Sequence, residues 1–400
     1  MTGVVLAVSS VAEDAIAAAI AAHPSLSLVR RCADLAEALA TASAGVATVA
    51  VVSPQPHLDR VSLTELTHMG VRVVGVAADE GDRRALTALG IVVVDESDPD
   101  GVARLAATAP VPAPTPAPET PTPSGAVVAV WGPTGAPGRT SVSVNLAAQV
   151  ARERTVVVAD LDVNGAAVAQ ALGIANETPG VAALARAAAQ GSVDSDAVRR
   201  LTVRAGERLS VLTGLQRASR WAEVAPAALE GAWPALRAAA DVTVLDLGFG
   251  VLATERRDGA TIAALAEADV IVAVGSGDPV GMQRLVDALA DLGDAVPDAR
   301  DRTLVVVNRV RATVAGPQPE RQVADALARY AGVSEAWMIP WDPRTADAAA
   351  LRGATWLEVA PRAASTRAVV VLANAVLRAL EREVGDTPAP SRAPAAALTD

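Results

Sequence analysis

Residues 126–150 contain the side chains of this chain that are best suited to binding a phosphate group. The segment AVVAVWGPTGAPGRTSVSVNLAAQV runs from a hydrophobic strand through a loop rich in glycine and proline into an amphipathic helix. In such an arrangement backbone N–H groups and the helix N-terminus face the anion, a basic side chain reaches the outer phosphates, and a hydroxyl binds Mg²⁺. Arg139, Thr140 and Ser141 open the helix directly after Gly138. The segment therefore predicts a phosphate-binding loop.

The loop does not fully match the phosphate-loop pattern G-x-x-x-x-G-K-[S/T]. Counted back from Gly138, the first glycine position holds Pro133, and Gly132 stands one residue earlier. The basic position holds Arg139 in place of lysine. Taken alone, the segment is equally compatible with a tight turn between a strand and a helix that binds nothing.

Three carboxylates at the ends of two other hydrophobic strands favour the phosphate site. TVVVADLDVNG places Asp160 and Asp162 after one strand, and DVTVLDLGFG places Asp246 at the end of another, where a carboxylate can hold Mg²⁺ through water. The carboxyl ends of parallel strands meet in one crevice of an α/β sheet. Each aspartate by itself could cap a helix instead, but this explanation is weaker for all three together.

Strands and helices alternate along residues 125–385, as a parallel sheet that positions these groups requires. The expected strands are 126–131, 155–160, 209–212, 242–247, 270–274 and 303–308. The expected helices are 140–153, 226–239, 259–266, 279–292 and 365–384. This order predicts a doubly wound domain whose phosphate loop follows its first strand.

Residues 1–108 show the same alternation in a shorter form. The expected strands are 4–8, 26–29, 47–52, 71–77 and 91–94. The expected helices are 12–22, 33–42, 58–68 and 82–89. The pattern predicts a flavodoxin-like sandwich of five βα units, and it resembles a response-regulator receiver domain in size and order.

The resemblance to a receiver does not extend to the chemistry of one. Ser53 follows the third strand, where a phosphoacceptor aspartate would stand, and two serines at residues 9–10 replace the acidic pair after the first strand. The fifth strand ends at Asp95 and Glu96, where a receiver has lysine. Without clustered carboxylates there is no Mg²⁺ site, so we expect a pseudo-receiver used for protein contacts. A divergent acidic site at Asp95, Glu96 and Asp98 is the alternative.

Two proline-rich segments divide the chain. APVPAPTPAPETPTPS at 109–124 favours an extended, semi-rigid spacer, and the Pro/Ala-rich stretch 386–400 is expected to be a disordered tail. The predicted fold class is α/β with two doubly wound parallel-sheet domains. An N-terminal flavodoxin-like pseudo-receiver occupies 1–108, and a C-terminal P-loop NTPase domain occupies 125–385.

Composition limits the function classes further. The net charge of −11 argues against nonspecific binding of the whole chain to nucleic acid. No run of 18 uncharged apolar residues is present and the N-terminus is a poor signal peptide, so we expect a soluble cytoplasmic protein. The single cysteine, Cys32, excludes an intrachain disulfide. The chain contains no lysine, so every fixed positive side chain is an arginine.

Residues 125–385 resemble the deviant-Walker (MinD/ParA) ATPases. TGAPGRT at 134–140 aligns with the KGGxGKT loop of that family, and Asp160 and Asp162 match its DxD. Further similar segments are LGFG after Asp246, GDPVG at 277–281, VVNRVR at 306–311 and IPWD at 339–342. The branch that looks nearest is the CpaE/TadZ-like one, which also joins a degenerate receiver domain to such an ATPase.

The resemblance implies a role for each matching residue in binding ATP and Mg²⁺. The residues around the phosphates would be Gly135, Ala136, Gly138, Arg139, Thr140 and Ser141, with Asp160 nearby. The Thr140 hydroxyl would bind Mg²⁺, Asp246 would hold the ion through water, and Asp162 would position the attacking water. The residues beside the adenine would be Asn308, Arg309, Pro340 and Asp342.

Departures from the family pattern fall on the groups needed for hydrolysis. The signature lysine of the family corresponds to Thr134, one loop glycine is Ala136, and Pro137 lacks an N–H donor. Arg139 keeps the charge of the Walker lysine but is larger and forked. Because groups that stabilise transition-state charge contribute orders of magnitude in rate, we expect nucleotide binding with weak or absent hydrolysis. The chain is an ATPase only if this altered loop is active.

Three functions are compatible with these observations. The first is a regulatory or localising ATPase homologue for pilus, secretion or division machinery, able to dimerise and to be recruited to a pole, a septum or the inner membrane face. The second is a nucleotide-independent scaffold that acts by protein–protein contacts. The third is DNA partitioning of the ParA kind, which the net charge and the absence of a basic arm disfavour.

Overall fold

The fold was obtained as a computed structural model, which describes residues 1–108, 125–135, 138–175, 179–191 and 193–386. The predicted linker at 109–124 and the predicted tail from residue 387 on lie outside the described residues. The chain divides into two compact units. The first comprises Met1–Ser124, Pro179–Leu201 and Ser219–Ala239, and the second comprises Gly125–Thr178, Thr202–Ala218 and Ala240–Asp400.

The first unit contains a five-stranded sheet in which every pair of neighbouring strands is parallel. The strands are β1 (Thr2–Ala7), β2 (Leu26–Arg31), β3 (Val49–Val52), β4 (Arg72–Ala77) and β5 (Val92–Asp95). Their order, β2-β1-β3-β4-β5, is that of flavodoxin-like folds. The β-branched runs of residues 1–108 therefore form the sheet that their alternation with alanine-rich stretches predicts.

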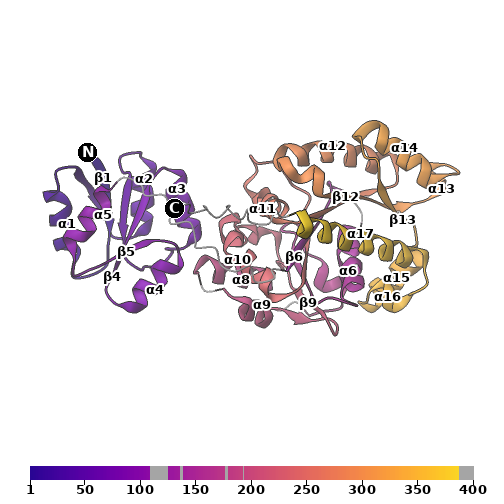
Figure 1. The fold of residues 1–400 in the computed structure, drawn as a ribbon, viewed down its shortest axis with the longest axis horizontal. Helices are drawn as coiled ribbons and strands as arrows, with labels where there is room; N and C mark the ends of the chain where they lie inside the picture. Colours follow the sequence, from indigo (N-terminus) through magenta and orange to yellow (C-terminus); the bar gives the residue numbers. More distant parts are fainter. Residues whose placement is uncertain (109–124, 136–137, 176–178, 192, 387–400) are drawn as a thin grey trace, which may run out of the picture. The chain divides into compact units, whose positions relative to one another are not determined.

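Helices cover both faces of this sheet, as Figure 1 shows in indigo and violet. They are α1 (Glu13–Ala22), α2 (Leu35–Ser43), α3 (Arg60–His68), α4 (Glu80–Ala88) and α5 (Pro99–Ala107). Ile16, Ile20 and Val102 pack on one face of the sheet, whereas Leu35 and Leu66 pack on the other. Residues 1–108 thus contain apolar clusters of their own on both sides of the sheet, together with a smaller one formed by Ala77, Leu86 and Ile91.

The first unit also includes three helices from the middle of the chain: α8 (Gly180–Ala189), α9 (Ser195–Leu201) and α10 (Pro226–Ala239). Ala185 and Ala189 of α8 pack against Ala228 of α10. The sequence predicts α10 with the bounds that the structure shows. The predicted domain division places all three helices within 125–385, whereas the structure groups them with the first unit.

The second unit contains an eight-stranded sheet with the order β13-β12-β11-β6-β10-β7-β9-β8. Its strands are β6 (Ala126–Trp131), β7 (Val156–Leu161), β8 (Val203–Arg204), β9 (Leu209–Leu212), β10 (Val242–Leu247), β11 (Val270–Ser276), β12 (Thr303–Val310) and β13 (Ala336–Pro340). Neighbouring strands are parallel except for the short β8, which runs antiparallel to β9. The strands on either side of β6 carry buried valine and leucine on both faces, as parallel strands covered by helices require.

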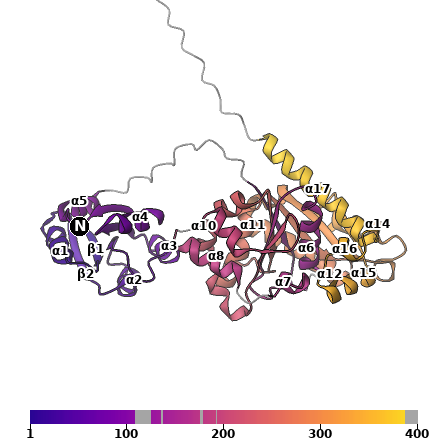
Figure 2. The same ribbon diagram turned by 90° about the horizontal axis from the view of Figure 1, so that it is seen from below.

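One face of this sheet packs against α6 (Arg139–Val150) and α17 (Ala364–Asp386), which lie side by side in Figures 1 and 2. The other face, at β12, packs against α12 (Pro279–Ala295) and α14 (Pro319–Ala331). Consecutive side chains of β12 point to opposite faces of the sheet. Val306 packs on the α6–α17 side, whereas Val305 and Val307 pack on the α12–α14 side. The remaining helical segments of the unit are α7 (Val168–Ala171), α11 (Gly259–Glu267), α13 (Ala312–Ala315), α15 (Pro343–Arg352) and α16 (Trp356–Val359).

Three short 3₁₀ turns, Ala218–Glu223, Arg256–Asp258 and Pro297–Arg302, complete the described elements. Within these described parts, no helix is long and apolar enough to cross a membrane.

Candidate functional site

The register of the second sheet places two of the predicted carboxylates side by side. Asp246 of β10 is the register partner of Asp160 of β7 on one side and of Val130 of β6 on the other. Val130 comes two residues before the loop that connects β6 to α6. The carboxyl ends of these three strands therefore bring the loop, Asp160 and Asp246 together, as the sequence pattern predicts.

Helix α6 begins at a glycine that no other residue could replace without a local shift. Gly138 has a φ of 92°, in the left-handed region, and a Cβ there would lie 2.2 Å from Nδ2 of Asn308. No side chain caps this end of the helix. Gly138 has no side chain that could accept from the N–H groups of the first turn of this 12-residue helix, and a helix N-terminus of this kind favours an anion.

Asp246 accepts hydrogen bonds from two hydroxyls of α6. The Thr140 hydroxyl donates to Oδ2 at 2.8 Å, and the Ser143 hydroxyl donates to Oδ1 at 2.6 Å. The carboxylate is almost fully buried, with 1% of its surface exposed. Burial raises the pKa of Asp246 to about 6, while the two hydroxyls oppose the rise. The pair of hydroxyls at the start of α6 therefore holds a carboxylate that burial would otherwise favour in its neutral form.

Asp160 is buried beside Asp246, and its carboxylate accepts hydrogen bonds from the backbone. Its carboxylate accepts from the backbone N–H of Val168 at 2.9 Å and of Asp162 at 3.3 Å. Burial, followed by the charge of Asp246, raises the pKa of Asp160 to about 8. Asp160 thus shapes the turn after β7, and its raised pKa favours the neutral form of this carboxyl beside Asp246.

Asp162 forms an ion pair with the loop arginine. Its Oδ1 accepts from the backbone N–H of Asn164 at 2.9 Å and of Gly165 at 3.1 Å, which fixes the carboxylate at the end of β7. Its Oδ2 lies 3.3 Å from Nη2 of Arg139, and both side chains are largely buried. Nη1 of Arg139 donates to the carbonyl of Gly132 at 3.0 Å. The guanidinium therefore lies across the loop, between β6 and β7.

A second arginine reaches the loop from α12. Nη1 of Arg284 donates to the carbonyl of Thr134 at 3.4 Å. Gly135 has a φ of 69°, and a Cβ there would lie 2.3 Å from the same nitrogen. Gly135 thus allows the Arg284 guanidinium to lie directly against the loop backbone.

The residues that are expected beside the adenine lie at the ends of β12 and β13. Asn308 adjoins Gly138, and its Oδ1 accepts from the backbone N–H of Arg309 at 2.8 Å. Arg309 has a left-handed φ of 58°, which is uncommon for a residue other than glycine. Its guanidinium lies 4.9 Å from the ring centre of Trp341, and the Arg311 guanidinium lies 5.8 Å from it. Trp341 is 41% exposed and lies one residue after the end of β13.

Pro340 and Asp342 flank this tryptophan, but they have different structural roles. Pro340 is the last residue of β13 and is the register partner of Val310. Asp342 caps α15, and its carboxylate accepts from the Thr345 backbone, the Thr345 hydroxyl and the Ser365 hydroxyl. Its contacts are thus those of a helix cap, whereas Pro340 positions the chain next to Trp341.

Most of the residues that the sequence singles out converge on this edge of the sheet, while Ala136 and Pro137 lie outside the described residues. Sequence reasoning missed Ser143, Arg284 and Trp341. Ser143 follows Thr140 by three residues on the same helix, so its position on the same face was a usable signal. The sequence contains no comparable signal for Arg284, because its contact with the loop depends on the packing of α12.

The described residues contain no group of three His, Cys, Asp or Glu side chains arranged to hold a metal ion. Mg²⁺ commonly uses one or two carboxylates together with phosphate oxygens and water. The Thr140 hydroxyl and the Asp246 carboxylate, joined beneath an uncapped helix N-terminus, fit that second arrangement.

In the first unit, Ser53 accepts a hydrogen bond from the Ser9 backbone N–H at 2.9 Å, at the position where a receiver has its aspartate. Asp95 accepts from the hydroxyl and the backbone N–H of Ser97, and these bonds lower its pKa. Asp98 caps α5 through the Gly101 backbone. Two of the three carboxylates of the alternative acidic site, those of Asp95 and Asp98, thus have local structural partners. Among the described residues, Oε2 of Glu96 is buried without a hydrogen-bond partner.

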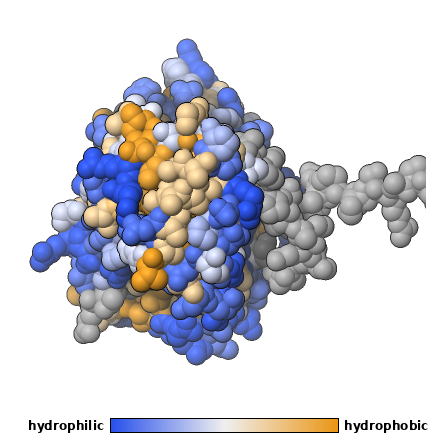
Figure 3. Space-filling view, turned by 90° about the vertical axis from the view of Figure 1, so that its left-hand side faces the viewer, coloured by the Kyte–Doolittle hydropathy of each residue, from blue (hydrophilic) through white to orange (hydrophobic). Residues whose placement is uncertain are grey.

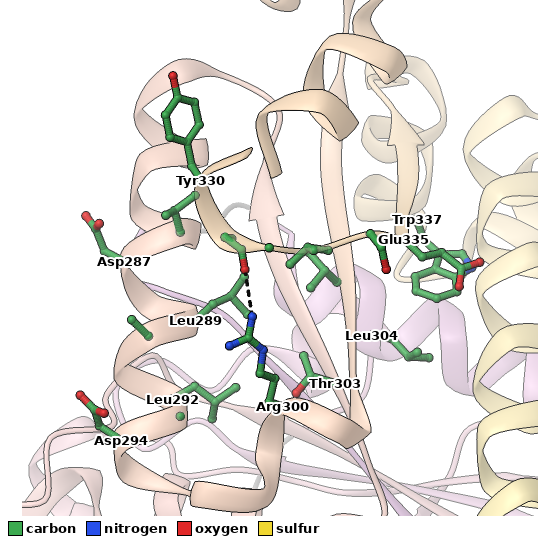
Figure 4. A pocket seen from close by; sticks show the side chains of 18 residues that line it. Asp287, Leu289, Leu292, Asp294, Arg300, Thr303, Leu304, Tyr330, Glu335 and Trp337 are labelled. Atoms are coloured by element: carbon green, nitrogen blue, oxygen red, sulfur yellow. Dashed lines mark hydrogen bonds between the residues drawn. The ribbon is translucent and has the colours of Figure 1, made fainter. Parts of the chain in front are cut away.

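A cavity of about 720 Å³ lies elsewhere in the second unit, between α12, β12 and the segment from α14 to β13 (Figure 4). Its lining includes Leu289, Leu292, Tyr330 and Trp337, and it contains none of the predicted site residues. Arg300 projects into it and donates to the carbonyl of Ala331 at 3.4 Å. The cavity adjoins the beginnings of β12 and β13, away from the strand ends that carry the loop and the aspartates.

Comparisons with known proteins agree with this geometry. The ParA family ATPase from Chlorobium tepidum TLS has 15% identity and a TM-score of 0.55, and the match covers 63% of this chain and 99% of that one. The septum site-determining protein MinD complexed with Mg-ADP from Pyrococcus horikoshii OT3 has 18% identity, a TM-score of 0.51 and coverage of 67% and 100%. The cell division ATPase MinD from Pyrococcus furiosus has 19% identity, a TM-score of 0.50 and coverage of 65% and 99%. At these identities the likenesses show the fold alone.

A search of curated proteins finds no match. The family model "CobQ/CobB/MinD/ParA nucleotide binding domain" matches residues 128–353, which is more than half of the chain. This range includes the phosphate loop, the three aspartates and the Asn308–Trp341 region. The chain therefore belongs to the CobQ/CobB/MinD/ParA nucleotide-binding domain family.

Proposed function

We propose that this protein binds ATP with Mg²⁺ at the loop between β6 and α6 and hydrolyses it weakly or not at all. The observation that carries the proposal is the hydrogen bonding of Thr140 and Ser143 to the buried Asp246. A buried carboxylate held by hydroxyls at an uncapped helix N-terminus suits a hydrated cation next to a phosphate. An ordinary turn between a strand and a helix does not require this cluster.

The roles of the remaining residues follow from their places around the loop. The phosphates would contact the loop from Gly135 to Ser141, including Arg139, and the ion would contact Thr140 directly and Asp246 through water. The adenine would lie near Asn308, Arg309 and Pro340. Trp341, which is half-exposed and adjoins two guanidinium groups, would form one wall of the base site.

Weak hydrolysis is supported by the ion pair between Arg139 and Asp162. Asp162 is the carboxylate expected to position the attacking water, but in this structure it accepts from the Arg139 guanidinium and from two backbone N–H groups. A carboxylate already occupied in this way is a poor base for water. The same pair draws Arg139 toward β7.

The wider role that we propose is that of a CpaE/TadZ-like localisation or regulatory protein, with residues 1–108 as a pseudo-receiver joined by the 109–124 linker to the nucleotide-binding domain. Its partners would be components of pilus, secretion or division machinery, with a nucleotide-linked homodimer as the active form. Figure 3 shows a band of apolar residues across an otherwise hydrophilic side of the molecule. Exposed large apolar side chains within residues 1–108 include Val11, Val29, Val46 and Val92.

Isothermal titration calorimetry with ATP and Mg²⁺ tests the binding proposal. We expect wild type to bind, and we expect Arg139→Ala and Asp246→Asn each to weaken binding about tenfold or more, because each change removes a charge-assisted contact. Arg321→Ala is the matched control, since Arg321 is an exposed surface residue of α14 paired with Asp325. Wild-type protein that gives no binding heat and no ATP-dependent thermal shift would instead be a nucleotide-independent scaffold.

A further inference from the structure

We propose that Arg284 of α12 is a second phosphate-contacting arginine besides Arg139, which supplies positive charge to the outermost phosphate of a nucleotide bound in the β6–α6 loop. This inference rests on the proposed binding of ATP and goes beyond it by assigning a residue outside the loop and outside the sequence motifs. Arg284 would make the site distinguish a nucleoside triphosphate from a diphosphate.

The position of the guanidinium is the first argument. Nη1 of Arg284 donates to the Thr134 carbonyl at 3.4 Å, and the absence of a Cβ at Gly135 lets the same nitrogen approach the loop backbone. Thr134 and Gly135 are exposed on the rim of the loop. A phosphate held by the loop and the start of α6 would therefore have the Arg284 guanidinium at its solvent side.

The fold explains how a residue from α12 comes to lie there. Strand β11 pairs with β6, so the helix that follows β11 begins next to the loop that follows β6. Asp278 caps α12 by accepting from the Gly281 backbone, and Leu285 anchors the helix in the core. Arg284 directly precedes this anchor, so its backbone is fixed while its long side chain is free to adjust.

The charges around the loop are the second argument. Arg139 is paired with Asp162, so the basic residue of the loop itself is already neutralised. Thr134 adds no charge. Among the residues that the structure describes, Arg284 has no carboxylate within ion-pair distance, and its nearby helix residue Asp287 accepts from Gln283 instead. Arg284 is therefore a cation at the rim of the loop that an incoming anion can reach.

The chemistry of guanidinium is the third argument. A guanidinium presents parallel N–H donors that match two oxygens of one phosphate, and its weak bond to the Thr134 carbonyl is easily exchanged for a charged acceptor. In the proposed complex, the terminal phosphate of a triphosphate would lie farther toward the rim than that of a diphosphate. Loss of Arg284 should therefore weaken ATP binding more than ADP binding.

Titration calorimetry of the full chain with ATP and with ADP, each with Mg²⁺, tests this inference. We expect Arg284→Ala to weaken ATP binding about tenfold or more, the usual effect of losing a hydrogen bond between charged groups, and to weaken ADP binding less than about threefold. Arg284→Lys should recover part of the ATP affinity because it keeps the charge. Arg321→Ala, which also removes an exposed arginine but from α14, is the control and should match wild type.

The outcomes separate this inference from the proposed function. If wild type binds neither nucleotide, both fail together. If wild type binds ATP and Arg284→Ala binds it equally well, only the role of Arg284 is overturned. Equal weakening of ATP and ADP, with no recovery in Arg284→Lys, would show that Arg284 only supports the loop conformation and would also overturn the inference.

Discussion

At the scale of single residues, the charges of the site are concentrated on one buried carboxylate and one ion pair. Asp246 has a hydroxyl on each oxygen, and Asp162 has a guanidinium on one oxygen and backbone donors on the other. Both hydroxyls come from α6, so the position of the helix and the ionisation of Asp246 depend on one another. Ser143 is the member of this group that the family motif does not include.

We predict that Ser143→Ala lowers the free energy of unfolding by about 1–3 kcal/mol in the nucleotide-free protein. The change removes the donor to Oδ1 of Asp246, and a buried polar atom without a partner is costly. Urea unfolding followed by circular dichroism measures the difference. Ser141→Ala on the same helix is the control, because its side chain is only partly buried. Equal midpoints for the two variants would contradict the prediction.

The candidate site could be predicted from the sequence where the chemistry follows strand ends. Asp160, Asp162 and Asp246 each follow a run of β-branched residues, and parallel strands place such residues at one edge. The pairing of Arg139 with Asp162 could not be predicted in this way, because it depends on the side-chain conformation within the loop. Arg284 could not be predicted either, because α12 meets the loop only through the order of strands in the sheet.

At the scale of elements, side-chain hydrogen bonds also join β7 and β10 at their amino ends, opposite the site. Asp241, just before β10, accepts from the backbone N–H of Thr155 at 2.7 Å and from its hydroxyl at 2.8 Å. The Asp241 backbone N–H donates in turn to the Thr155 hydroxyl at 3.0 Å. These bonds connect the start of β10 to the start of β7. The two strands that carry Asp246 and Asp160 are thereby held in register from the opposite end.

We predict that Asp241→Ala destabilises the protein by about 1 kcal/mol at pH 7 and by less in acid. The hydrogen bonds from Thr155 lower the pKa of Asp241 below its ordinary value of 3.8. A carboxyl whose folded pKa is lowered stabilises the fold above its unfolded pKa, and this contribution is lost as the pH falls through the folded pKa. The difference between wild type and variant should therefore shrink below about pH 4.

Urea unfolding at a series of pH values from 7 to 3 measures this difference. Asp291→Ala serves as the control, since Asp291 is an exposed residue of α12. A difference between wild type and Asp241→Ala that stays constant over the whole series would exclude the carboxylate as its cause.

The strands that the sequence predicted least well are short ones without a continuous run of buried apolar residues. The strands β6, β9 and β10 have the predicted bounds, because each is a run of apolar residues ended by a polar or glycine-rich turn. Strand β13 was not predicted, since AWMIP is short, lies at the edge of the sheet and is only partly buried. The two-residue β8 has no signal in the sequence, because only its pairing with β9 defines it.

At the scale of the whole molecule, the chain is divided differently by its sequence and by its internal contacts. The proline-rich segment 109–124 suggests that residues 1–108 fold alone, whereas the first compact unit of the structure also includes α8, α9 and α10. The apolar clusters on the two faces of the first sheet are made of residues within 1–108. The division that the sequence indicates stays a prediction, which the isolated fragment can test.

We predict that a fragment of residues 1–108 unfolds cooperatively, with a free energy of unfolding of about 5 kcal/mol or more, as is usual for a domain of this size. Urea titration followed by circular dichroism, together with the dispersion of amide resonances, checks this expectation. A fragment that lacks a cooperative transition would show that α8, α9 and α10 are required for the first unit to fold.

The side-chain amide of Asn308 connects the expected phosphate and adenine parts of the site, and this affects which ligands the site would prefer. One end of this side chain abuts Gly138 at the start of α6, and the other end accepts from the backbone of Arg309, next to Trp341. The two halves of a nucleotide would thus meet opposite ends of a single planar group. Such a connection favours the intact molecule over its separate fragments, so adenosine and pyrophosphate added together would be a poor substitute for one ligand in which both parts are covalently joined.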